Sequence, residues 1–151
     1  MRLAKRITGL DGDLKANQVQ LTKLTTEQMP SPLAMHGVGA VTAAIFVAVW
    51  SHPGRIRSEA TFAMIAGTCP IPASSGNTVR HRLNRGRDRR LNRAINTIAL
   101  TRMRTDKATR EYVERKIAEG RSKREIMRTL KRYIIRQSHR HLTTNPSLSV
   151  A

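Results

Sequence analysis

Two adjacent serines stand beside a dense run of arginines in the segment PIPASSGNTVRHRLNRGRDRRL, which runs from Pro70 to Leu91. A serine hydroxyl can attack a phosphate when a base or electropositive surroundings activate it, and fixed positive charge stabilises the transition state of phosphoryl transfer. Four arginines could supply that charge: Arg80, Arg82, Arg85 and Arg87. Ser, Gly and Asn are also common turn residues. Ser74 and Ser75 therefore belong either to a catalytic site or to a turn.

Positive charge dominates the composition. The 151-residue chain has a formal net charge of +18, and 21 of its 28 lysines and arginines lie between Arg80 and Arg140. Such a one-sided charge attracts polyanions, so nucleic acid is the expected partner. Proteins that bind single strands stack bases on aromatic rings, and this chain has one Trp, two Tyr and two Phe. The composition therefore favours phosphate contacts by Arg, Lys and backbone amides.

A membrane protein and a metal site are not expected. The longest apolar run, Val38 to Trp50, is shorter than the roughly 20 residues that span a bilayer. The lone Cys69 fits a reducing, cytoplasmic compartment. The five histidines show neither the helical spacing nor the cysteine partners of a metal site, and the ten acids are explained by helix starts and exposed faces.

The first segment carries a heptad pattern. Its seam positions are spaced alternately by four and three residues: Leu3, Ile7, Leu10, Leu14, Asn17, Leu21 and Leu24. A seam of this kind with one polar Asn is typical of a coiled coil, although Gly9 and Gly12 weaken a helix. The segment 1–28 is therefore expected to be a coiled-coil-like helix, or an amphipathic helix packed on its own domain.

Gly37-Val38-Gly39 lies between two apolar pieces, as in a helix-hairpin-helix turn at 33–50. Two glycines allow a tight turn, and amides at the start of the next helix could face a phosphate. A plain hairpin without a ligand is the alternative.

Local capping signals predict the later helices. Ser58 and Gly67 delimit one helix, Asp88 and Asp106 begin two more, and Ser122 with Glu125 forms a capping box. The expected apolar faces include Tyr112, Val113 and Ile117 in one helix and Tyr133 in the last. We therefore expect a mostly or all α fold, in which a compact helical domain at 33–137 follows the first helix and a basic, loosely ordered tail occupies 138–151.

Three stretches resemble a known family. GVGAVTAA, the segment FAMIAGTCPIPASSGNTVRHRLNRGRDRRLNRAI and the closing EGRSKREIMRTLKRYI look like the C-terminal transposase domain of serine-dependent insertion-sequence transposases. These bridge-RNA-guided recombinases carry an N-terminal DEDD, resolvase-like domain. The resemblance covers about Leu33 to Tyr133, and its most specific motif is AG-x-x-P followed by SSG-x-T and arginines.

The resemblance implies roles for particular residues. The serine before the glycine is the family's nucleophile, which places Ser75 in the catalytic position. The implied nucleic-acid contacts are Gly37, Gly39, Thr78, Arg80, Arg82, Arg85, Arg87, Arg89 and Arg90. A coiled coil precedes the domain in this family, which favours a homodimer or higher oligomer through the first helix.

The resemblance also implies partners outside this chain. No DEDD domain precedes the heptad, so Mg²⁺ is implied only for that missing domain, and no cofactor is expected here. The expected partners are DNA, a structured guide RNA and a DEDD domain in cis or in trans, in a prokaryotic cytoplasm and at the nucleoid when bound to DNA.

Two functions follow as alternatives. In the first, the chain is the serine-bearing, DNA-binding part of a recombinase that is expected to be inactive without its DEDD domain. In the second, it is a non-catalytic nucleic-acid-binding remnant or a regulator of transposition, which pairs with an intact transposase.

Both alternatives predict a steep dependence of DNA binding on salt. Each phosphate that a Lys or Arg neutralises releases counterions, so the binding constant falls by about 0.9 decade per contact for each decade of salt. Titrations of labelled duplex DNA between about 50 and 200 mM salt measure this slope. Binding that stays constant over that range would contradict the charge argument.

Overall fold

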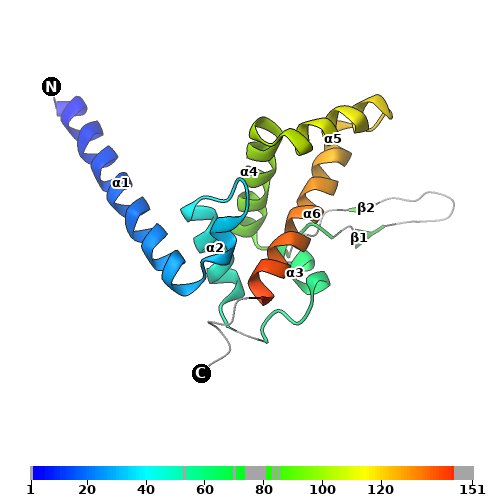
Figure 1. The fold of residues 1–151 in the computed structure, drawn as a ribbon, viewed down its shortest axis with the longest axis horizontal. Helices are drawn as coiled ribbons and strands as arrows, with labels where there is room; N and C mark the ends of the chain where they lie inside the picture. Colours follow the sequence, from blue (N-terminus) through cyan, green and yellow to red (C-terminus); the bar gives the residue numbers. More distant parts are fainter. Residues whose placement is uncertain are drawn as a thin grey trace.

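The computed structural model describes residues 2–52, 54–69, 71–73, 81–82, 84 and 86–144. Helices dominate this part of the chain, as the sequence predicted (Figure 1). The elements in chain order are α1 (Arg2–Gln28), the 3-10 helix η1 (Ser31–Ala34), α2 (Ala40–Trp50), α3 (Glu59–Ala66), β1 (Ile71–Pro72), β2 (His81–Arg82), α4 (Arg89–Thr105), α5 (Lys107–Ala118) and α6 (Lys123–Thr143).

Four of the helices, α3, α4, α5 and α6, begin where the capping residues predicted. Each cap side chain accepts a hydrogen bond from a backbone amide of its own first turn, which satisfies a donor that the helix leaves free. The distance from the amide nitrogen to the cap oxygen is 3.2 Å from Thr61 to Ser58, 2.8 Å from Leu91 to Asp88, 3.1 Å from Thr109 to Asp106 and 3.3 Å from Glu125 to Ser122. In return, Glu125 Oε2 accepts a bond from the Ser122 amide at 2.9 Å. The predicted capping box is therefore confirmed.

One hydrophobic core joins α2, α3, α4 and α6. Phe46, Phe62 and Ile95 are fully buried in it, and α6 adds Ile134 and Ile135. Full burial of an isoleucine or phenylalanine contributes about 1.5–3 kcal/mol of stability. α5 crosses between the ends of α4 and α6 (Figure 1) and covers this core only in part, since none of its residues is buried.

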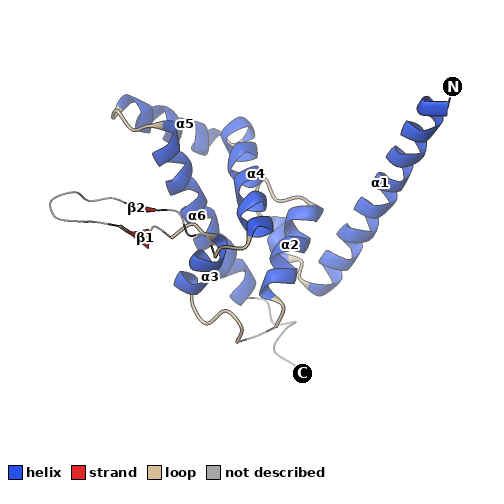
Figure 2. Ribbon diagram, turned by 180° about the vertical axis from the view of Figure 1, so that it is seen from behind, coloured by secondary structure: helices blue, strands red, loops and turns tan. Residues whose placement is uncertain are grey.

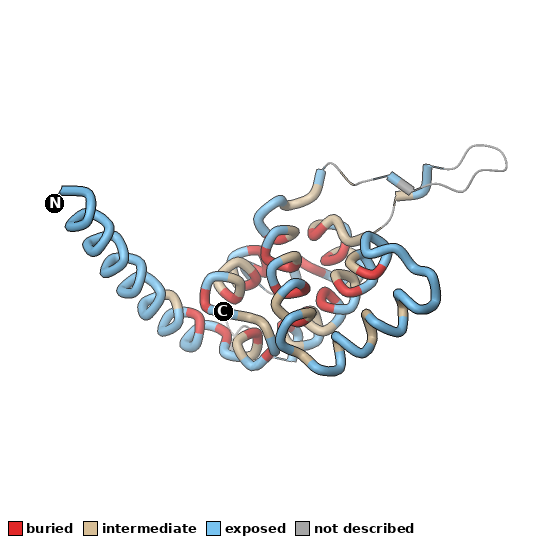
Figure 3. The backbone as a smooth tube through the Cα atoms, turned by 90° about the horizontal axis from the view of Figure 1, so that it is seen from above, coloured by how far each residue is buried: buried red, intermediate tan, exposed pale blue. Residues whose placement is uncertain are grey.

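α1 projects away from the helical body. Its last turn is held by Thr25, which is buried, and by Met29, which follows the helix. The exposed fractions of the seam side chains Leu3, Ile7 and Leu14 are 78%, 60% and 65%, and the tube of α1 is pale blue along most of its length (Figure 3). The seam up to Leu14 therefore does not pack on the described part of its own chain.

The expected helix-hairpin-helix differs in its first arm. η1 is a single 3-10 turn rather than an α-helix, whereas α2 begins after Gly39 as expected. Gly37 takes φ +79°, and a Cβ there would lie 3.3 Å from Arg102 Cγ and 3.4 Å from the Ile98 carbonyl oxygen of α4. The glycine thus serves close packing of the turn on α4.

A nearly buried guanidinium fixes the same turn. Arg102, which is 7% exposed, donates from Nε to the His36 carbonyl oxygen and from Nη1 to Gln137 Oε1, both at 2.8 Å. Burial lowers the pKa of Arg102 from its ordinary value, and the Asp106 carboxylate opposes that effect. The turn, α4 and α6 are therefore tied by one side chain.

Burial differs from the sequence expectation at the ends of the domain. Ile117 and Tyr133 are exposed by 47% and 63%, and Tyr112 and Val113 are only half-buried, so the predicted apolar faces there are wrong or incomplete. α6 also continues to Thr143 with Ser138 and Leu142 buried. The loose tail was therefore predicted to begin too early, because Ser138 and Leu142, spaced by four residues, continue the buried face of α6.

Gly37→Ala should lower the free energy of unfolding by about 2 kcal/mol, since the left-handed backbone costs an alanine about 1 kcal/mol and crowding against α4 adds roughly as much again. Gly120→Ala is the control, because Gly120 has the same φ of +79° and a Cβ there meets no described atom within 4 Å. Urea unfolding of both variants measures the difference. Equal losses would contradict the packing role of Gly37.

Candidate nucleic-acid interface

α6 carries two rows of side chains on opposite faces. Ile126, Leu130 and Ile134 follow one another at i, i+4 and are buried. Arg128, Arg132 and Arg136 have the same spacing but are offset by two positions, which is about 200° around the helix. The arginine row therefore faces away from the core.

The arginine row borders a cavity of about 710 Å³, which we call the basic groove. The ends of α3 and β2, the start of α4 and the middle of α6 enclose it. Its described lining residues are Gly67, Thr68, Cys69, Arg82, Asn84, Asn92, Arg128, Thr129, Lys131, Arg132, Tyr133 and Arg136. Five of them are Arg or Lys, and none is a carboxylate. Such a lining suits phosphate groups, which pair with Arg and Lys.

Like charges inside the groove are held close together. Burial lowers the pKa of Lys131, and the positive charge of Arg87 lowers it further. The ammonium Nζ of Lys131 reaches Asn92 Oδ1 at 3.5 Å, a long contact. A phosphate entering the groove would relieve this repulsion, which makes the groove electrostatically suited to a polyanion.

One carboxylate lies at the edge of the groove. Glu59, in the first turn of α3, forms an ion pair with Arg132, and its Oε2 lies 3.6 Å from Arg136 Nε. This contact orients both guanidinium groups and ties α3 to α6. It leaves Arg128 and Lys131 without a carboxylate partner among the described residues.

Asparagine amides close the floor of the groove. Asn92 Nδ2 donates to the Ala66 carbonyl oxygen at 2.6 Å, and Asn84 Nδ2 donates to that of Met64 at 3.0 Å. Both carbonyls belong to the last turn of α3, whose carbonyl oxygens have no partner within the helix, and the Met64 oxygen also accepts a bond from the Gly67 amide at 3.0 Å. Gly67 follows them with φ +65°, and a Cβ there would lie 2.3 Å from Arg87 Cδ. Only glycine lets the Arg87 side chain cross this helix end.

Two short strands lead away from the groove. β1 and β2 pair antiparallel, with Ile71 opposite Arg82 and Pro72 opposite His81, and they extend beyond the helical body (Figure 2). Arg82, in β2, lines the groove. Ser75, Thr78, Arg80 and Arg85 were expected in the site and lie outside the described residues.

The remaining predicted contacts are only partly brought together. Arg82 lines the groove and Arg87 is half-buried beside it, whereas Arg89 and Arg90 are exposed in the first turn of α4. Gly37 packs on α4, and the Gly39 amide donates to Thr42 Oγ1 at 3.0 Å. That amide is engaged within the protein, and phosphate contact at Gly37 and Gly39 stays a prediction.

Sequence reasoning missed the α6 cations of the groove. Arg128, Lys131, Arg132 and Arg136 sit in a helix that was assigned to the core by its apolar face. Their signal was present, because arginines at i, i+4 and i+8 opposite an apolar row indicate a continuous basic face.

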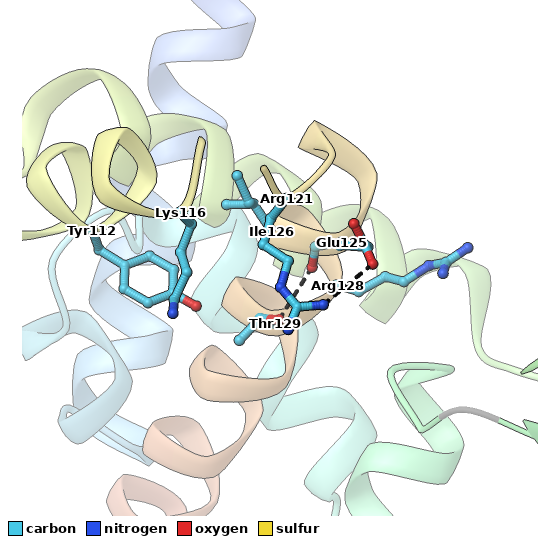
Figure 4. A pocket seen from close by; sticks show the side chains of 7 residues that line it. All are labelled: Tyr112, Lys116, Arg121, Glu125, Ile126, Arg128 and Thr129. Atoms are coloured by element: carbon cyan, nitrogen blue, oxygen red, sulfur yellow. Dashed lines mark hydrogen bonds and ion pairs between the residues drawn. The ribbon is translucent and has the colours of Figure 1, made fainter. Parts of the chain in front are cut away.

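A second cavity, of about 440 Å³, opens between α5 and α6 (Figure 4), and we call it the Tyr112 cavity. Its lining residues are Tyr112, Lys116, Arg121, Glu125, Ile126, Arg128 and Thr129. Arg115 Cζ and Lys116 Nζ lie 5.7 and 5.9 Å from the centre of the Tyr112 ring, within reach of cation–π attraction.

No three His, Cys, Asp or Glu side chains among the described residues are grouped as metal ligands would be. Likewise, no helix described here combines the length and apolar character that crossing a bilayer requires.

Comparison with known proteins identifies the family. Residues 33–114 match the sequence model of the transposase IS116/IS110/IS902 family, so the chain belongs to that family. The chain is 30% identical over 133 residues to the insertion element IS110 uncharacterized 43.6 kDa protein of Streptomyces coelicolor, and the alignment covers 86% of this chain and 33% of the relative. It is 33% identical over 124 residues to the insertion element IS900 uncharacterized 42 kDa protein of Mycobacterium paratuberculosis, and that alignment covers 79% of this chain and 31% of the relative. The matched region therefore spans about a third of each relative's length.

Lys131→Gln should weaken binding of duplex DNA roughly three- to tenfold and reduce the salt slope by about 1, because a phosphate contact in the groove is lost. Lys123→Gln is the matched control, since Lys123 is exposed in the first turn of the same helix and does not line the groove. Anisotropy titrations at several salt concentrations measure both quantities. An equal effect of the two substitutions would argue against the groove as the interface.

Proposed function

We propose that the chain is the DNA-binding part of an insertion-sequence transposase and carries the serine that attacks DNA, Ser75. The basic groove is the observation that supports DNA binding most directly, since it gathers five cations, four from α6 and Arg82 from β2. Family membership supports a transposase rather than another nucleic-acid-binding protein. Ser75 lies in sequence between β1 and β2, and Arg82 of β2 lines the groove, which supports a role of the groove cations in the reaction at Ser75.

The proposed chemistry is a phosphoryl transfer. Ser75 Oγ forms a bond to a DNA phosphorus while the bond from that phosphorus to one sugar oxygen breaks. The hydroxyl proton of the serine passes to a base, and the departing sugar oxygen takes up a proton. Attack by a second sugar hydroxyl reverses these steps and joins new DNA ends. Groove cations neutralise the phosphate charge that the transition state spreads over its oxygens.

Partners outside the described residues belong to the same proposal. A DEDD domain with Mg²⁺, in cis or in trans, would complete the active site, and a structured guide RNA would select the target. Pairing through α1 would bring two copies together, and the exposed seam of Leu3, Ile7 and Leu14 supports this association. The Asn17 position would fix its register.

The exposed seam also favours a second candidate function. In this function the chain pairs through α1 with an intact transposase and regulates transposition without cutting DNA. This function needs the groove and the seam but not Ser75.

Covalent trapping separates the two functions. The full chain is incubated with labelled element-end DNA, structured RNA from the same element and Mg²⁺, with and without a DEDD domain in trans, and is run on denaturing gels. A protein–DNA adduct is expected with the DEDD domain present, and Ser75→Ala should abolish it. Ser74→Ala is the matched control and should retain most of the adduct. DNA binding without an adduct in any arm would overturn the catalytic proposal and favour the regulator.

A further inference from the structure

Both tyrosines of the chain lie beside basic cavities. Tyr133 lines the basic groove and is 63% exposed, and Tyr112 lines the second cavity and is half-buried. The Tyr133 ring is largely exposed, whereas the Tyr112 ring packs partly against the core and borders the cavity with the rest of its surface. Tyrosine rings that lie beside cations are typical of surfaces that hold nucleic-acid bases.

The two cavities adjoin along α6. Arg128 and Thr129 line both of them, so a strand that leaves the groove past Arg128 enters the Tyr112 cavity. Figure 4 shows Arg128, Thr129 and Arg121 on the α6 side of this cavity and Tyr112 with Lys116 on the α5 side. The ring and the cations therefore approach one space from two helices.

The acid of the cavity is already engaged. Glu125 Oε2 accepts bonds from the Ser122 amide at 2.9 Å and from Ser122 Oγ at 2.8 Å, and its Oε1 lies 3.7 Å from Arg121 Nη1. The capping box keeps this carboxylate at the helix start. Lys116, Arg121 and Arg128 thus give the cavity a net positive lining.

We propose that the Tyr112 cavity is a subsite for one unpaired nucleotide of the strand that occupies the basic groove. The base stacks on the Tyr112 ring, and its phosphate lies between Arg121 and Arg128. The volume of about 440 Å³ lies in the range of pockets that enclose small ligands. This inference rests on the proposed nucleic-acid binding and adds that the bound strand is locally unpaired.

The combination of groups favours a nucleotide over other anions. A fully paired duplex keeps its bases stacked inside and would leave the Tyr112 ring without a partner. An acidic peptide would satisfy the cations, but it offers no flat face to the ring. Only an unstacked base uses the ring and the cations together.

The test compares blunt and overhanging probes. Hairpin duplexes are prepared blunt, with a short DNA overhang and with a short RNA overhang, each overhang carrying one fluorescent 2-aminopurine. Binding to the full 151-residue chain is followed by anisotropy, and stacking is followed by quenching of the 2-aminopurine.

Tyr112→Leu should weaken binding of the overhang probes about tenfold and remove the quenching, because base–aromatic stacking is lost. The leucine keeps an apolar side chain against the core, and thermal unfolding verifies the fold. Tyr112→Phe preserves the stacking face and should stay within about twofold of the original protein. Binding of the blunt probe should change little in either Tyr112 variant.

Three results would overturn the subsite. These are an equal loss for blunt and overhang probes in Tyr112→Leu, quenching that survives this substitution, and displacement by poly-glutamate as effective as displacement by an oligonucleotide of equal charge. The test does not use the adduct at Ser75. A chain that stacks the overhang on Tyr112 but forms no adduct would support the subsite and contradict the catalytic proposal.

Discussion

A single helix, α6, has to be apolar on one face and densely cationic on the other. Ile126, Leu130 and Ile134 hold it against α3 and α4, and burial of each contributes about 2 kcal/mol. That packing fixes the opposite row, in which Arg128 and Arg132 would otherwise move apart. Every cation of the groove that comes from α6 is therefore positioned by the hydrophobic core beneath it, and the core limits how far the charges can separate.

Polar contacts make the crowded charge tolerable. Glu59 neutralises part of the arginine row, and Asn92 offers its amide oxygen to Lys131. Elsewhere the buried Arg102 guanidinium uses the His36 carbonyl and Gln137 in place of water. Such contacts reduce the desolvation cost of buried cations without cancelling their charge. The free protein thus keeps an unrelieved positive field at the groove, which a polyanion would relieve.

Sequence patterns identified what local interactions decide. Ser58, Asp88, Asp106 and Ser122 begin helices because each cap bonds to an amide three residues away, within one turn. Burial was predicted less well, because it depends on which elements meet. Tyr133 points away from the core, and Ile117 lies on a helix that crosses the end of the bundle. The groove could not be predicted as a unit, since its lining comes from α3, β2, α4 and α6.

The position of Glu59 makes the groove and the fold compete for the same two guanidinium groups. A phosphate that binds Arg132 and Arg136 must share them with this carboxylate or displace it. Because Glu59 also begins α3, whose far end forms the groove floor, ligand occupancy and the anchoring of α3 become thermodynamically linked. The bound and free proteins would then differ in how firmly α3 is held. The carboxylate thus acts as an internal competitor, which raises the phosphate concentration needed to occupy the groove.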